Sequence, residues 1–219
     1  MAAVPFFSAF SLNDLMFMAQ GAAKTLLLTL WSGLLGTVVG VVVGWIRSTR
    51  VPVVSQLLGV YIDVIRTVPL IIQFIVVNSG ASILGAPLTP FGTGILVLSF
   101  YMGGFVAEVV TAGIHAVSDT LRKAGRSLGL SYWKDVRYIV LPLSLRAVFP
   151  AWIGLLLGLM KDSSLIAVVG YIELLRASQI IINRTEQPLQ VLLGAGAFYF
   201  VMSFAASRYA ASLERRWQF

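Results

Sequence analysis

Long apolar stretches separated by short polar connections dominate the chain. A helix needs about 20 mainly apolar residues to cross the hydrocarbon core of a bilayer. Five stretches meet this requirement, at residues 21–46, 55–82, 92–114, 148–172 and 188–210. Because a backbone surrounded by lipid must satisfy its own hydrogen bonds, stretches of this kind fold as α-helices. The pattern therefore predicts an all-α integral membrane protein with about five transmembrane helices in a single domain, residues 1–219.

The first stretch is rich in glycine at helical spacing. Gly33, Gly36, Gly40 and Gly44 follow one another at intervals of three and four residues. One face of the expected helix is then nearly free of side chains, so another helix can approach it closely. We interpret this face as a packing surface.

The longest polar segment, residues 115–147, lies between the third and fourth stretches. It concentrates basic side chains and is expected to be a structured loop on one membrane face; the cations are Arg122, Lys123, Arg126, Lys134, Arg137 and Arg146. Positive charge favours the cytoplasmic side. Placing this loop and the C-terminus inside puts most of the 16 Lys and Arg residues there, with the N-terminus outside. Residues 1–20 contain no Lys or Arg, so they lack the basic region of a cleavable signal peptide.

Composition narrows the function classes. With 58% hydrophobic residues, 11% charged residues and a mean hydropathy of +0.89, a soluble globule would expose large apolar patches. The net charge of +7 fits loop charge that orients a membrane protein, and no nucleic-acid partner is expected. The absence of Cys excludes disulfides and thiolate sites, and the single His115 makes a metal site improbable.

Several ionisable residues fall inside the apolar stretches, where each costs at least about 2.5–3.5 kcal/mol. They are Asp63, Arg66, Glu108 and the adjacent Lys161 and Asp162. Asp63 and Arg66 are three residues apart, so they can form an ion pair on one helical face. One interpretation is that this pair and Glu108 only neutralise one another inside the bundle.

The other interpretation is a solute site. Pro69 closely follows Arg66 and Thr67 and should break the helix at depth, while Asp162 and Ser163 begin a polar cluster after an apolar run. Both segments should face a wet cavity. A guanidinium with a nearby carboxylate supplies receptors for both charges of a zwitterion.

Catalysis is a weaker interpretation of these groups. The sequence has no Ser-His-Asp arrangement, no paired His, no nucleophile elbow and no phosphate-binding P-loop. Any work driven by ATP must therefore come from a partner. An intramembrane enzyme lacks a nucleophile–base pair, and a stand-alone secondary transporter or channel would need inverted repeats, which the sequence does not show.

The polar loop carries a family resemblance. The segments 123–133 (KAGRSLGLSYW) and 137–142 (RYIVLP) resemble the EAA loop of binding-protein-dependent ABC importer permeases. More narrowly, segments 61–70 (YIDVIRTVPL), 107–114 and 161–165 (KDSSL) resemble the polar amino acid permeases, which handle histidine, glutamine, arginine or glutamate and aspartate. The likeness spans about residues 20–216.

The resemblance implies a methionine-importer-like (type I) permease core in the bacterial cytoplasmic (inner) membrane. It implies two permease subunits, identical or paralogous, on an ABC ATPase dimer that binds ATP and Mg, and an extracytoplasmic amino-acid-binding protein; the permease itself needs no cofactor. The expected solute contacts are Arg66, Thr67, Glu108, Asp162 and Ser163.

The loop also makes sense as a docking element from its own residues. Ser118 can cap a helix that runs to about Ser127, Gly129 can end it in the left-handed conformation, and Ser131 can start a second helix. Pro142 should then force the chain out toward the membrane. The expected contacts with the ATPase are Ala124, Leu128, Gly129, Leu130, Tyr132 and Trp133. The alternative is an amphipathic loop that its arginines hold to anionic lipid.

Three departures from the family pattern bear on function. Lys123 stands where the family favours Glu, and Gly125 where it favours Ala. In the fourth stretch, Gly154 and Leu155 replace a frequent Asn-Glu pair, which argues against a substrate with a cationic side chain.

Overall fold

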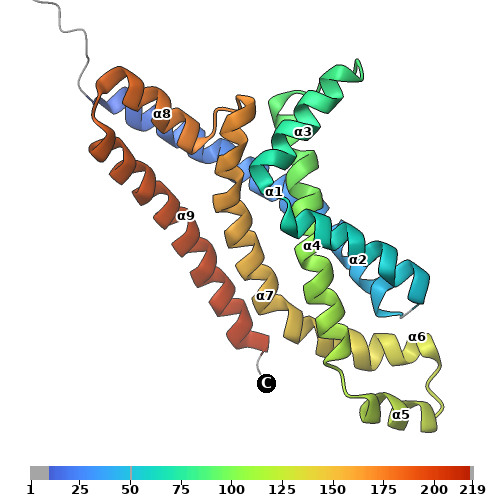
Figure 1. Cartoon of the computed structure of the whole chain (residues 1–219). Helices are drawn as coiled ribbons and strands as arrows, with labels where there is room; N and C mark the ends of the chain where they lie inside the picture. The colour runs from blue at the N-terminus through green and yellow to red at the C-terminus, as the bar shows by residue number, and fades with distance from the viewer. Residues whose placement is uncertain (1–9, 50, 218–219) are drawn as a thin grey trace, which may run out of the picture.

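The structure, a computed structural model, describes residues 10–49 and 51–217, and its regular elements are all helices (Figure 1). In chain order they are α1 (Leu12–Ser48), α2 (Pro52–Thr67), α3 (Leu70–Ile83), α4 (Pro90–His115), α5 (Asp119–Ser127), α6 (Tyr132–Asp135), a π-helical segment (Val136–Val140), α7 (Leu141–Asp162), a 3-10 segment (Ser163–Val169), α8 (Leu174–Thr185) and α9 (Pro188–Trp217).

About five of these units have the length and polarity of membrane spans, which confirms the expected fold class. Four helical runs qualify alone: α1, α4, Tyr132–Val169 and Pro188–Ser212. The pair α2 and α3 passes the same test when the two helices are taken together, and it makes a fifth span if the pair is counted as one; it is bent by 105° at the break between them. The break falls between Thr67 and Leu70, where Pro69 has no N–H with which to continue the hydrogen-bond ladder.

Helix α1 packs on α4 through its glycine face, as the spacing predicted. A Cβ atom on Gly40 would lie 2.4 Å from Cβ of Val106 and 2.8 Å from the carbonyl oxygen of Gly103. Gly36 and Gly44 approach α4 equally closely. The glycines thus allow the backbones to touch, and α4 becomes the centre of the bundle.

This close approach predicts a large difference between two Gly→Ala substitutions. Gly40→Ala should destabilise the bundle by about 1–3 kcal/mol, because the added methyl overlaps Val106 and Gly103. Gly59→Ala in α2 is the matched control: nothing lies within 4 Å of its Cβ position, so alanine should keep or raise stability. Thermal unfolding in detergent measures both, and equal midpoints would contradict the packing.

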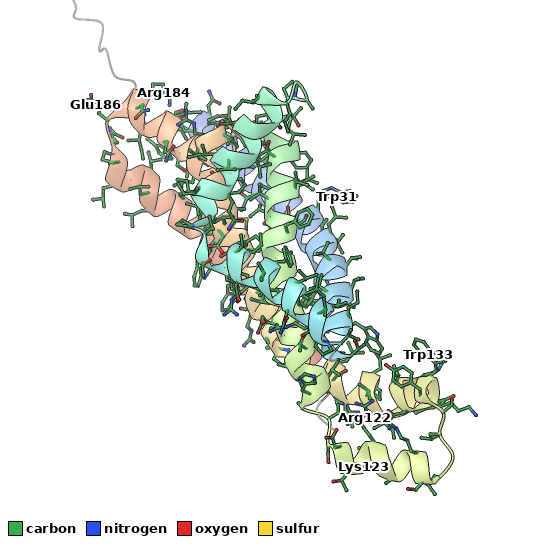
Figure 2. The ribbon with its side chains drawn as sticks, turned by 45° about the vertical axis from the view of Figure 1, so that its right-hand side comes forward. Trp31, Arg122, Lys123, Trp133, Arg184 and Glu186 are labelled. Carbon is green, nitrogen blue, oxygen red and sulfur yellow. The ribbon has the colours of Figure 1, made fainter. Side chains whose placement is uncertain are left out.

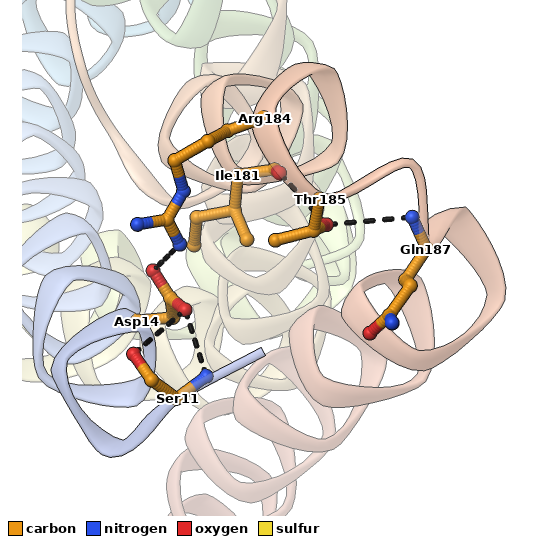
Figure 3. Close-up of polar contacts among 6 residues, drawn as sticks. All are labelled: Ser11, Asp14, Ile181, Arg184, Thr185 and Gln187. Atoms are coloured by element: carbon orange, nitrogen blue, oxygen red, sulfur yellow. Dashed lines mark hydrogen bonds and ion pairs between the residues drawn. The ribbon is translucent and has the colours of Figure 1, made fainter. Parts of the chain in front are cut away.

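The two ends of the bundle differ in character. At one end, α8 lies beside the start of α1, and Arg184 forms an ion pair with Asp14 (Figure 3). Asp14 also accepts hydrogen bonds from the backbone N–H and hydroxyl of Ser11. At the other end, α5 and α6 extend away from the bundle, and α9 finishes on the same side (Figure 1).

The expectation that Pro142 ends the second helix of the loop is wrong. Pro142 does not force the chain out of a helix; it lies in the first turn of α7, and the helical run continues from Tyr132 to Val169. The π-helical segment that precedes it explains this, because its wider turn moves away the carbonyl that a proline ring would strike. The fourth helix therefore starts well before residue 148.

Candidate functional site

One face of α4 organises the candidate site. Tyr101, Phe105 and Glu108 recur at intervals of four and three residues, so their side chains lie on one face of the helix. The rings of Tyr101 and Phe105 pack with centroids 5.0 Å apart. We call these three residues the α4 row.

Glu108 sits between two arginines from other helices. Arg47, in the last turn of α1, donates to one carboxylate oxygen of Glu108. Arg66, in the last turn of α2, approaches the other oxygen at 3.8 Å. The guanidinium of Arg66 also lies over the ring of Phe105, 5.4 Å from its centroid. Since Glu108 is already neutralised by Arg47, Arg66 retains donors for another anion.

Asp63 does not pair with Arg66. No ion pair among the described residues includes Asp63, although the spacing permits one. Instead, Asp63 lines an open hollow of about 920 Å³ with Arg47, Glu108 and His115. The second span thus places Arg66 against α4 and Asp63 in this open hollow.

Asp162 reaches the other end of the α4 row. The hydroxyl of Tyr101 donates to Asp162 over 3.4 Å, and both line a small cavity of about 120 Å³ between α4 and α7. Gly154 and Gly158 form part of its wall. A cation, Arg66, and a carboxylate, Asp162, therefore flank the aromatic pair of α4.

The remaining two expected contacts are bonded within their own helices. The hydroxyl of Thr67 donates to the carbonyl of Asp63 at 2.6 Å. Ser163 is fully buried, and its hydroxyl donates to the carbonyl of Met160 at 2.8 Å. The structure thus brings Arg66 and Asp162 to the α4 row, which includes Glu108, but keeps the hydroxyl of Ser163 in the core.

Sequence reasoning missed three members of this arrangement. Neither the charge pattern nor the family resemblance assigned Arg47, Tyr101 or Phe105 a place in the solute site. The spacing of Tyr101, Phe105 and Glu108 in α4 was the available signal, because it places two aromatic rings on the face of an intramembrane carboxylate. Nothing in the sequence indicated that Arg47 would reach Glu108.

The polar loop forms the second functional feature. Helix α5 ends at Ser127, and Gly129 has a φ of +83°, the left-handed conformation predicted for it. The N–H of Leu130 donates to the carbonyl of Gly125, and the N–H of Gly129 to that of Arg126, which closes the helix end. Ser118 is at the cap position but makes no side-chain cap, contrary to expectation.

Exposed apolar and basic side chains cover the loop. Leu128 is 86% exposed and Trp133 is 71% exposed, and Tyr132 is also exposed. Leu130 is half-buried, because it packs over Gly125. Figure 2 shows Lys123 and Trp133 projecting from this end of the molecule, far from Arg184 and Glu186 at the opposite end.

A buried ion pair holds the loop together. The Nε and Nη2 atoms of Arg122 each donate to Oδ2 of Asp135 at 3.0 Å, joining α5 to α6. Asp135 is fully buried. This ion pair ties α5 to α6 within the loop.

A buried carboxyl organises the opposite end. Glu173 accepts the backbone N–H groups of Leu175 and Arg176, the first turn of α8. The hydroxyls of Tyr199 in α9 and Thr25 in α1 also donate to it. Burial raises the pKa of the Glu173 carboxyl, although these hydrogen bonds act in the other direction. Glu173 thus joins three helices at this end.

Comparisons with known proteins agree with this architecture. A family model described as the binding-protein-dependent transport system inner membrane component matches residues 36–219. The glutamine transport system permease protein of Escherichia coli strain K12 is 30% identical over 195 residues, covering 86% of this chain and 89% of the relative. The probable glutamine ABC transporter permease protein of Bacillus subtilis strain 168 is 29% identical over 214 residues, covering 96% and 98%.

Solved structures share the fold. A crystal structure of an amino acid ABC transporter with histidines has a TM-score of 0.86 at 26% identity, covering 95% of this chain and 100% of the other. An inward-facing structure of a methionine ABC transporter has a TM-score of 0.84 at 18% identity, covering 96% and 100%, which supports the fold alone.

Proposed function

The chain belongs to the family of binding-protein-dependent transport system inner membrane components, and from this premise we propose that it is the permease subunit of an ABC importer that carries a polar amino acid. The observation that carries the proposal is the placement of Arg66 and Asp162 on either side of the α4 row. Two relatives are named for glutamine transport, and one similar solved structure is an amino acid ABC transporter; these names support the same class of cargo.

We propose that the two charged groups bind the two ends of the amino acid. Arg66 takes the carboxylate, with help from Thr67, because a guanidinium presents a planar fork of donors. Asp162 takes the ammonium group. One carboxylate oxygen of Glu108 binds Arg47, and the other holds Arg66 in position. Contact with Ser163 would require the 3-10 segment to rearrange, since its hydroxyl is bonded to Met160.

The shape of the small cavity bears on the side chain of the cargo. Asp162 is its one carboxylate among the described lining residues, and the rest of the wall is apolar apart from Tyr101. Once Asp162 binds the ammonium group, no acidic group is left for a cationic side chain. We therefore propose a cargo with an uncharged side chain.

Energy would come from a partner. The family implies an ATPase and a binding protein as partners. We propose that an ATPase dimer binds ATP and Mg, and that two permeases, identical or paralogous, dock on it through α5, α6 and their connection. Closure of the ATPase would move this unit and switch the bundle between outward- and inward-facing states. The extracytoplasmic binding protein would deliver the amino acid at the α8 end.

Reconstitution tests the proposal. The chain, its candidate ATPase and its binding protein are placed in proteoliposomes, and uptake of labelled amino acids is measured with and without ATP. We expect uptake only with ATP and binding protein present. Uptake driven by an ion gradient without ATP would identify a secondary transporter instead.

Orientation is a separate prediction. We propose that the α5–α6 end is cytoplasmic in the bacterial inner membrane, because its exposed cations follow the positive-inside rule. A reporter active only in the cytoplasm should then work when fused after Phe219 and fail when fused before Met1. Activity at both ends would contradict the odd number of spans.

A further inference from the structure

Two adjoining spaces near the start of the polar loop have opposite character. The first, the apolar slot, has a volume of about 300 Å³ and lies between α1, α4 and α7. Its lining includes Thr37, Val41, Trp45, Val110, Phe149 and Trp152.

The hydroxyls of the slot and the indole N–H of Trp152 already have partners. The hydroxyl of Thr37 donates to the carbonyl of Gly33 at 2.6 Å and accepts from Nε1 of Trp152 at 2.9 Å. The hydroxyl of Ser144 donates to the carbonyl of Leu141. These contacts use the donors of Thr37, Ser144 and Trp152, and the rest of the lining is apolar apart from the indole of Trp45, so an apolar occupant fits the slot best.

The second space, the polar hollow, has a volume of about 460 Å³ and lies between the ends of α1 and α4 and the loop. Its lining includes Ser48, Thr49, His115, Ser118, Asp119 and Arg122. Trp45 and Ile114 line both spaces, so slot and hollow adjoin.

We propose that the slot and the hollow together bind a membrane phospholipid. One acyl chain fills the slot, and the head group enters the hollow, with an amine toward Asp119 and its phosphate toward Nη1 of Arg122, since Nε and Nη2 hold Asp135. The polarity fits an amphiphile, whose acyl chain matches the apolar slot and whose charged head group matches the hollow. Trp45 lies where the two environments meet, as tryptophans do at membrane interfaces.

The change from an apolar lining in the slot to a charged lining in the hollow fits a phospholipid better than a second copy of the chain. A helix from a second copy could cover the apolar slot but would leave Asp119 and the Nη1 side of the Arg122 guanidinium in the hollow without an opposite charge. The bound lipid would sit between the bundle and the α5–α6 unit and stiffen their junction. The inference depends on the membrane location of the chain and not on its cargo.

The test uses the full chain purified in mild detergent and two matched pairs of variants. Val41→Phe fills the slot; Val38→Phe makes the same change three residues earlier on α1, outside the slot, and both positions are exposed, at 44% and 62%. Thr49→Glu places a carboxylate in the hollow, where it repels a phosphate; Thr120→Glu adds the same charge on α5 outside it. Native mass spectrometry identifies the lipid that each protein retains, and circular dichroism checks folding.

We expect the unaltered chain, Val38→Phe and Thr120→Glu to retain a phospholipid with an amine head group, and Val41→Phe and Thr49→Glu to lose it severalfold. Equal retention by all four variants would place the lipid elsewhere and overturn the proposal. So would an unaltered chain without lipid, or a dimer that Val41→Phe dissociates, because a second copy would then occupy the slot.

Discussion

Replacing Gly129 with valine is expected to abolish coupled uptake while the bundle stays folded in the membrane. Gly129 has a φ of +83°, and nothing lies within 4 Å of its Cβ position. The effect of valine is therefore backbone strain and not a clash, at a cost of about 1–3 kcal/mol. Relief of this strain would turn Leu128 and Trp133 away from their present directions. Uptake and stimulation of the ATPase should fall together, as measured in proteoliposomes.

Two variants control for strain alone. Gly129→Asn should keep most activity, because asparagine tolerates the left-handed conformation. Gly85→Val imposes a similar strain at the α3–α4 connection, where φ is +73° and the Cβ position is equally open. It should leave association with the ATPase intact. Normal association in Gly129→Val would show that the loop is not the docking site.

The sequence predicted the features that depend on local chemistry. The length of the apolar stretches predicted the membrane spans, and Pro69 predicted the break between α2 and α3. The spacing of the glycines predicted the contact face of α1. Gly129 was placed in the left-handed region because a helix end of that pattern needs it. Each of these follows from a few neighbouring residues.

The missed features depend on contacts between distant parts of the chain. Arg47 pairs with Glu108, 61 residues away, and Arg66 approaches Glu108 and not Asp63, the partner that local spacing allowed. Pro142 was misread because the π-helical segment before it accommodates the ring. The burial of Glu173 requires α1 and α9 to meet at α8, which no local pattern shows.

The arrangement around Glu108 gives a sharp test of the solute site. Arg66→Lys keeps a positive charge near Glu108 but loses the planar fork of donors. A hydrogen bond to a charged group contributes about 1.5–3 kcal/mol, so the amino acid concentration for half-maximal uptake should rise about tenfold or more. Basal ATP hydrolysis and folding should not change. Arg208→Lys, an exposed position on α9, controls for the substitution itself.

Arg66→Ala separates binding from a purely structural role. Glu108 keeps Arg47 as its partner, and the side chain of Arg66 is 46% exposed, so removing this arginine strands no buried charge. The alanine variant should therefore fold with a nearly unchanged unfolding temperature and yet lose uptake at low amino acid concentration. Unchanged uptake by a folded Arg66→Ala variant across a full concentration series would remove Arg66 from the site and leave Asp162 as its charged group.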